Sequence, residues 1–79
     1  MEGEPTRQRE INQLAEAIAN YYGLEGDERL ARIEAWTKVL LTGASLPLET
    51  QDDEERLKFE RAMEHELGDI WREYSHLVT

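Results

Sequence analysis

The feature that most constrains the fold is the helical periodicity of residues 51–78, the last third of this 79-residue chain. When the segment is plotted at about 100° per residue, its apolar side chains fall within one sector of roughly 80°. They are Phe59, Met63, Leu67, Ile70, Tyr74 and Leu77, with Trp71 and Val78 at the edge. One helix over about 51–77 would be roughly 42 Å long and would extend past its shorter neighbours. The pattern predicts that this helix either bends near Gly68 or leaves its end exposed.

A first, shorter helix is predicted over about residues 7–22, with Thr6 as its N-cap and Gly23 as its end. Its apolar stripe has helical spacing and consists of Ile11, Leu14, Ile18 and Tyr21. The opposite side carries mainly Asn, Gln and Ala instead of charged residues. We therefore expect this helix to lie centrally, with neighbours on two sides.

A second helix is predicted over about residues 28–42, with Asp27 as its N-cap and Gly43 as its stop. The residues expected to face the core are Leu30, Ile33, Trp36 or Thr37, and Leu40. Because the connection after the first helix is so short, these two helices are expected to form an antiparallel hairpin. Leu46 and Leu48 in the next connection should close one end of the core, and Thr50 should cap the third helix.

The chain shows no repeat and no run that alternates with period two, so it has no strand signal. The predicted fold class is therefore all-α: a three-helix domain made of an antiparallel helical hairpin plus one long C-terminal helix. At this length the chain forms one domain, with residues 1–5 expected to be a disordered N-terminus.

The formal net charge of -9 disfavours direct binding to nucleic acid or to anionic lipid. The apolar runs are far shorter than the roughly 18 residues of a membrane span. The N-terminus has no basic-then-apolar signal pattern. The sequence has no cysteine, which excludes disulfides and thiolate metal sites. We expect a soluble, cytoplasmic protein with no cofactor and no membrane partner.

The last third of the chain also carries the best candidate interaction residues. At its C-terminal end the candidates are Trp71, Tyr74, Leu77 and Val78, because large aromatic and aliphatic side chains supply most interface energy. At its acidic front they are Asp52, Asp53, Glu54, Glu55, Glu60 and Glu64. Such carboxylates can imitate a nucleic-acid backbone and occupy a basic groove. They can equally be a solvated helix face.

These residues predict a small acidic, non-enzymatic protein-interaction module with a basic protein partner. In its sharpest form it is an inhibitor or accessory factor of a nucleic-acid-handling protein. A homodimer through the C-terminal helix is the second option for a partner.

Metal-ligand spacing occurs on the same helix, where His65 lies four residues before Asp69 and Glu73 lies three residues before His76. The first pattern is interpreted as the polar side of the helix, because Arg72 lies within it and a site would need ligands from another element. The second is interpreted as a coincidence, because it occurs once and the di-iron bundles that use it require further inward carboxylates at matching depth. The sequence therefore predicts no metal-binding residue and no catalytic residue.

One resemblance supports an enzymatic alternative. Residues 66–71, Glu-Leu-Gly-Asp-Ile-Trp, resemble the Glu-x-x-Asp helix of the MazG-like all-α nucleotide pyrophosphohydrolases. By that resemblance Glu66 and Asp69 would hold magnesium against a nucleotide triphosphate. The likeness covers six residues, and the Glu-Glu-x-x-Glu motif of the family has no match in this chain.

Overall fold

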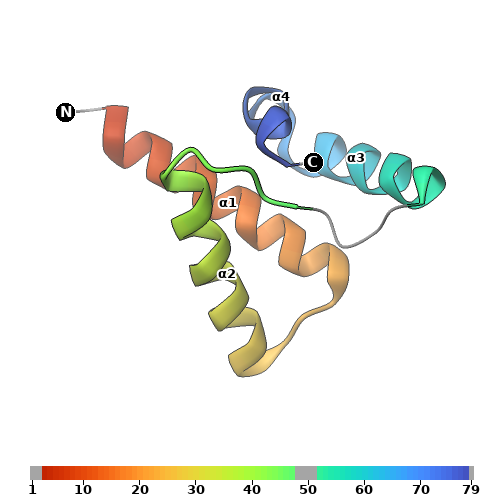
Figure 1. Cartoon of the computed structure of the whole chain (residues 1–79), viewed down its shortest axis with the longest axis horizontal. Helices are drawn as coiled ribbons and strands as arrows, with labels where there is room; N and C mark the ends of the chain where they lie inside the picture. The colour runs from red at the N-terminus through yellow and green to blue at the C-terminus, as the bar shows by residue number, and fades with distance from the viewer. Residues whose placement is uncertain (1–2, 48–51, 79) are drawn as a thin grey trace.

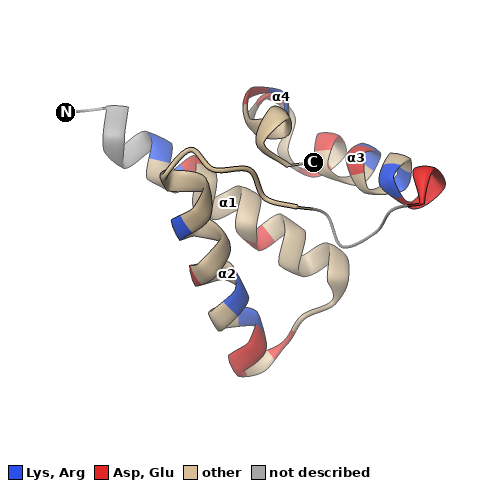
Figure 2. Ribbon diagram, viewed as in Figure 1, with Lys and Arg blue, Asp and Glu red and all other residues tan. Residues whose placement is uncertain are grey.

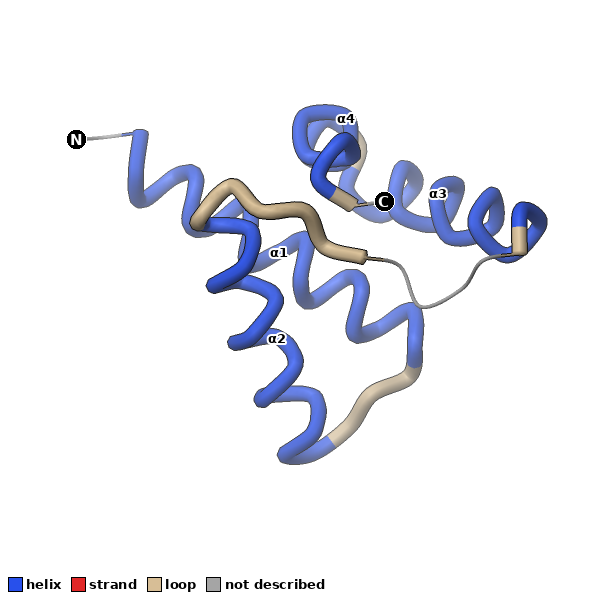
Figure 3. Tube along the Cα trace, viewed as in Figure 1, coloured by secondary structure: helices blue, strands red, loops and turns tan. Residues whose placement is uncertain are grey.

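The computed structural model describes residues 3–47 and 52–78, with side chains from Arg7 onward. The elements are α1 (Gly3–Tyr22), α2 (Gly26–Leu41), α3 (Asp53–Leu67), α4 (Asp69–Tyr74) and the short 3-10 helix η1 (Ser75–Leu77). Figures 1 and 3 show a short loop between α1 and α2 and a single residue between α3 and α4. The radius of gyration of 12.2 Å is close to the roughly 12 Å expected for a compact domain of this length. The predicted all-α class is confirmed.

Helix α1 is the central element. Its predicted stripe is buried at Ile11, Leu14 and Ile18, and Tyr21 packs against the same cluster. Three alanines on other sides of α1, Ala15, Ala17 and Ala19, are buried as well. The small alanines allow close approach by α2 on one side and by α3 and α4 on another (Figure 1). The expectation of a helix with neighbours on two sides is therefore confirmed.

Both ends of α1 follow from local chemistry. The helix begins at Gly3, so part of the segment expected to be disordered is helical. Pro5 is tolerated there because the first four N–H groups of a helix have no intrahelical partner. At the other end Gly23 has a φ of 70°. The N–H groups of Gly23 and Leu24 donate back to the carbonyls of Asn20 and Ala19, which closes the helix.

Helix α2 runs back along α1 at an angle (Figure 1). Its N-cap is Glu25 and not the expected Asp27, which lies in the first turn. Leu40 near its C-terminal end is fully buried, whereas Leu30 near its start is 66% exposed. The expected core face is therefore wrong at Leu30, because α2 meets α1 most closely at its C-terminal end and no other described helix covers its start.

The predicted long C-terminal helix is wrong as a continuous element. Helix α3 ends at Leu67 and α4 starts at Asp69, with Gly68 between them at φ 59° and ψ −118°. Side chains disfavour that backbone conformation, so glycine is needed at the break. The break turns α4 back onto α1, which buries Trp71 and Tyr74. Of the two alternatives that the sequence left open, a bend near Gly68 or an exposed helix end, the structure adopts the bend.

The start of α3 also differs from the sequence expectation. Asp52 is its N-cap, with the side chain accepting a hydrogen bond from the Glu54 N–H at 3.0 Å. The expected cap at Thr50 lies outside the described residues. An aspartate cap with three acidic residues in the first turn suits the positive end of the helix dipole.

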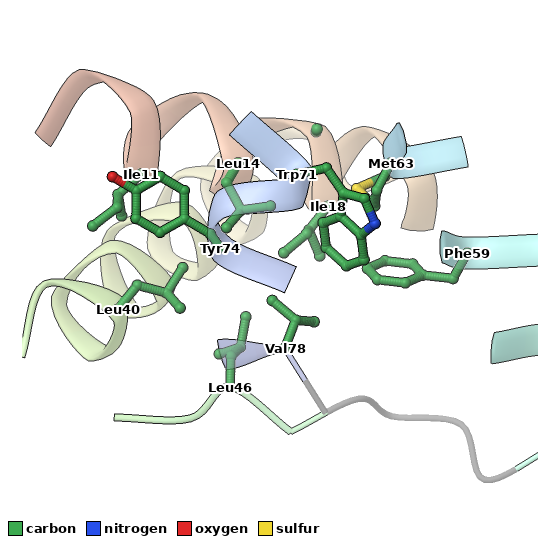
Figure 4. Packing of buried hydrophobic residues seen from close by; sticks show 11 residues of the cluster. Ile11, Leu14, Ile18, Leu40, Leu46, Phe59, Met63, Trp71, Tyr74 and Val78 are labelled. Carbon is green, nitrogen blue, oxygen red and sulfur yellow. The ribbon is translucent and has the colours of Figure 1, made fainter. Parts of the chain in front are cut away.

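The core lies between α1 and the broken C-terminal segment (Figure 4). The ring of Phe59 meets that of Trp71 edge-to-face with centroids 5.8 Å apart, and it meets Tyr21 at 5.1 Å. Leu46 and Val78 close the lower edge of the cluster, where the Leu46 N–H donates to the Leu77 carbonyl. The prediction for Leu46 is confirmed, and Leu48 lies outside the described residues.

Candidate functional site

The predicted aromatic interaction end is part of the core. Trp71 and Tyr74 are each 6% exposed and Val78 is 3% exposed. Leu77 is half-buried and packs against the same cluster. Figure 4 shows Trp71 and Tyr74 directed toward residues of α1. These four residues therefore form no exposed docking surface on the single chain, because the break at Gly68 folds them inward.

A hydrogen bond fixes α4 on α1. The hydroxyl of Tyr74 donates to a carboxylate oxygen of Glu10 at 3.0 Å. Burial, the hydrogen bond to Glu10 and the charges of Glu10 and Glu73 together raise the pKa of Tyr74 to about 12. Arg7 acts in the opposite direction. The neutral phenol is thus the form that the folded chain stabilises at physiological pH.

The acidic candidates divide into two groups by position on α3. Asp53, Glu54 and Glu55 lie in its exposed first turn, and none of them makes an ion pair with another described residue. Figure 2 shows this red turn at one extremity of the molecule. Unpaired carboxylates that project from the body of a chain with net charge -9 create a strongly negative local potential.

The remaining acidic candidates are engaged within the chain. Glu60 accepts from the Arg56 side chain at 3.3 Å, and Glu64 lies 3.8 Å from the Arg72 guanidinium. Asp52 uses its side chain to cap α3. Of the six acidic candidates, the three with neither an ion pair nor a capping role therefore lie together in the first turn of α3, while Glu66 at the other end of the helix is exposed as well.

Sequence reasoning missed Leu57, which is 49% exposed next to the acidic turn. It lies two residues before the buried Phe59, about 160° away around the helix, so it points outward. A surface depression of about 280 Å³ surrounds it, lined by Glu54, Glu55, Leu57, Lys58 and Arg61. The sequence did contain a signal for this exposure, because Leu57 is an apolar residue that lies outside the apolar sector of the helix.

The residues implied by the pyrophosphohydrolase resemblance lie on either side of the helix break. Glu66 is in α3 and Asp69 begins α4, so the Glu-x-x-Asp spacing is not carried by one continuous helix. Within residues 3–47 and 52–78 no group of three or more His, Cys, Asp or Glu side chains is arranged to hold a metal ion.

Comparisons with known proteins add no assignment: no protein-family model, no curated protein and no solved structure matches the chain. Among the helices of the described segments, none combines the length and apolar character required to cross a membrane.

Proposed function

We propose that this protein is a small acidic, non-enzymatic interaction module that binds a basic surface of another protein through the start of α3. The observation that supports this most directly is the position of Leu57, half exposed beside three unpaired carboxylates. We name Asp53, Glu54, Glu55 and Leu57 the α3 surface. The aromatic residues first expected to anchor the partner have no part in it, because they lie in the core.

The two components of the α3 surface have different roles. The carboxylates attract a basic partner over a distance and orient it, which affects the association rate and selectivity more than the final affinity. Leu57 supplies the apolar contact that slows dissociation once its side chain is desolvated. Lys58 and Arg61 line the same depression and limit the acidic patch, so the partner must be basic opposite the first turn and acidic or neutral opposite the second.

In its sharpest form the proposal makes the protein an inhibitor or accessory factor of a nucleic-acid-handling protein. A basic groove that binds phosphates is a surface that closely spaced carboxylates on a helix can occupy. Three free carboxylates in one helical turn support this form. A partner with any other basic surface satisfies the more general proposal.

The test uses the full chain, immobilised and exposed to an extract of the cells that produce it. Proteins retained at about 0.1 M salt and released at about 0.5 M are identified, because raising the salt shortens the electrostatic range from about 10 Å to less than half that. A water-soluble carbodiimide is then applied to join carboxylates to lysines in direct contact. We expect cross-links from Asp53, Glu54 or Glu55 to lysines of one retained protein.

Three variants test the proposal. Replacing Asp53, Glu54 and Glu55 by their amides should abolish retention, whereas replacing Asp27 and Glu28 in the first turn of α2 by theirs should preserve it. Leu57→Ser should weaken binding of the purified partner by about tenfold, the effect of roughly 1.4 kcal/mol. Retention that is insensitive both to salt and to the α3 triple substitution would overturn the proposal.

A further inference from the structure

Helix α2 differs in charge from the rest of the molecule. Three acidic and three basic residues balance within it, while α1, α3 and α4 each carry more acid than base. Figure 2 shows blue and red bands mixed along α2. Because the chain as a whole has a net charge of -9, α2 is the helix at which a second copy meets the least repulsion.

The same helix leaves two leucines uncovered on one side. Leu30 is 66% exposed and Leu41 is 37% exposed. They are eleven residues apart, which places them about 20° apart around the helix and roughly 16 Å apart along it. Between them on the exposed side, Lys38 and Glu34 form an ion pair of 3.7 Å. We name Leu30, Glu34, Lys38 and Leu41 the α2 stripe.

The other flank of α2 is covered within the chain. Ile33 is half-buried and Leu40 is fully buried. The guanidinium of Arg32 lies 5.9 Å from the centre of the Trp36 ring and shields its face. In the described part of the chain α1 is the main neighbour of α2. The α2 stripe is thus the side of the helix that remains available to another molecule.

We propose that the α2 stripe pairs with the α2 stripe of a second copy in an antiparallel dimer. In this arrangement Leu30 of each copy packs on Leu41 of the other, and the midpoint falls between Glu34 and Thr37. Lys38 then lies near Glu34 of both copies, so each side chain gains a second partner of opposite charge. A parallel pair would instead set the acidic first turns, with Asp27 and Glu28, against each other.

Charge also favours a second copy over a basic protein at this surface. The α2 stripe carries one acid and one base, so it attracts neither a basic nor an acidic partner selectively. An antiparallel copy of the same stripe is complementary to it in both charge and apolar position. Such self-complementarity is the condition for a two-fold symmetric interface.

The dimer is expected to be weak. The contact is confined to one 16-residue helix, about 24 Å long, and lies at the low end of protein interface sizes. Two chains of -9 also repel each other, and salt screens that repulsion. Dimerisation should therefore strengthen as salt is raised, whereas binding of a basic partner to the α3 surface should weaken. The opposite salt responses keep the two proposals separable.

The first test is sedimentation velocity of the full chain from about 5 µM to about 1 mM, at about 0.05 M and about 0.5 M salt. We expect a monomer–dimer equilibrium with a dissociation constant in the micromolar range that decreases at high salt. Leu30→Glu should raise that constant at least about tenfold, and Leu57→Glu on α3 should leave it unchanged. A strictly monomeric chain over this range, or equal effects of the two variants, would overturn the proposal.

The second test establishes the direction of the pair and uses the absence of cysteine from the sequence. An equimolar mixture of Leu30→Cys and Leu41→Cys chains should form a mixed disulfide under mild oxidation. Each variant alone should not, because its two cysteines would lie roughly 16 Å apart along the helices, beyond the reach of a disulfide of about 7 Å between Cα atoms. Efficient disulfide formation by Leu30→Cys alone would contradict the antiparallel arrangement.

Discussion

Replacement of Gly68 by L-alanine should destabilise the fold through the backbone alone. Gly68 has a φ of 59° and a ψ of −118°, and an added Cβ would have no neighbour within 4 Å. No steric clash with other residues therefore contributes. A non-glycine residue in such a region costs of order 1–3 kcal/mol, and the reduced freedom of the unfolded alanine chain offsets about 0.4–1 kcal/mol of that. We expect a net loss of roughly 1–2 kcal/mol.

The alanine variant could instead form one continuous helix through α3 and α4, and the free energy of that state must be compared with the loss. Alanine at position 68 favours a continuous helix through α3 and α4 by about 1 kcal/mol over glycine. Straightening would, however, remove Trp71, Tyr74 and Val78 from the core, and a single large core side chain is worth about 3–5 kcal/mol. Burial of these side chains contributes more free energy than helix propensity does, so the L-alanine variant should keep the break and become less stable.

The assay is thermal unfolding followed by circular dichroism. Since a domain of this size shifts by about 4–8 °C per kcal/mol, the midpoint should fall by about 5–15 °C. The total stability expected for 79 residues is about 4–12 kcal/mol, so the variant should remain folded at room temperature. In a Trp36→Phe background, the emission of Trp71 should stay that of a buried indole.

A mirror-image substitution provides the control. A D-residue at φ 59° and ψ −118° adopts the equivalent of an L-residue at −59° and 118°, which is an allowed conformation. A chemically synthesised chain with D-alanine at position 68 should therefore be as stable as the natural chain or more stable by about 0.4–1 kcal/mol. If L-alanine proved the more stable of the two and Trp71 became exposed, the argument that burial maintains the break would be refuted.

Three further predictions address other residues. Tyr74→Phe should cost about 1 kcal/mol at pH 7 through the lost hydrogen bond. The pKa of Tyr74 in the folded chain is raised from 10.0 to about 12, so the stabilisation of the fold by its neutral hydroxyl should be complete below pH 10 and lost as the pH rises toward 12. In denaturant titrations the difference in unfolding free energy between variant and wild type should therefore shrink over that pH range. Trp71→Ala should cost about 3–5 kcal/mol, whereas Leu57→Ala should change unfolding by no more than about 0.5 kcal/mol; similar values for both would contradict the assignment of core and surface. Calorimetric titration with Mg²⁺ and nucleoside triphosphates should give neither heat nor turnover, and Glu66→Gln should be silent; turnover abolished by that substitution would favour the enzymatic alternative.

Much of the fold was predictable from short-range patterns. The stripe of Ile11, Leu14 and Ile18 identified the buried face of α1, and the uncharged opposite side indicated a second contact. The sector around Phe59 and Met63 identified the buried face of α3 in the same way. These patterns depend on one helix at a time, so a periodicity of 3.6 residues is enough to find them.

The candidate site was less predictable. The acidic residues were visible in the sequence, and so was the pair of Arg56 with Glu60, because the two lie four residues apart on one helix. The contact of Glu64 with Arg72 spans the break at Gly68 and was not predictable. Ion pairing depends on which side chains meet in space. The exposure of Leu57 and Leu30 was missed for the same reason, because hydrophobicity alone does not show whether another helix covers a leucine.

The sequence by itself determined an all-helical chain with acidic charge concentrated toward its C-terminal part and with glycine at position 68. Glycine there permits both a straight helix and a sharp break, because it lacks the Cβ that restricts other residues. Only the tertiary structure decided between them. The free energy of burying Trp71, Tyr74 and Val78 against α1 exceeds that of continuing the helix, so the aromatic end forms the core. Leu30 of α2 and Leu57 of α3 stay exposed, because in the described part of the chain no other helix covers them.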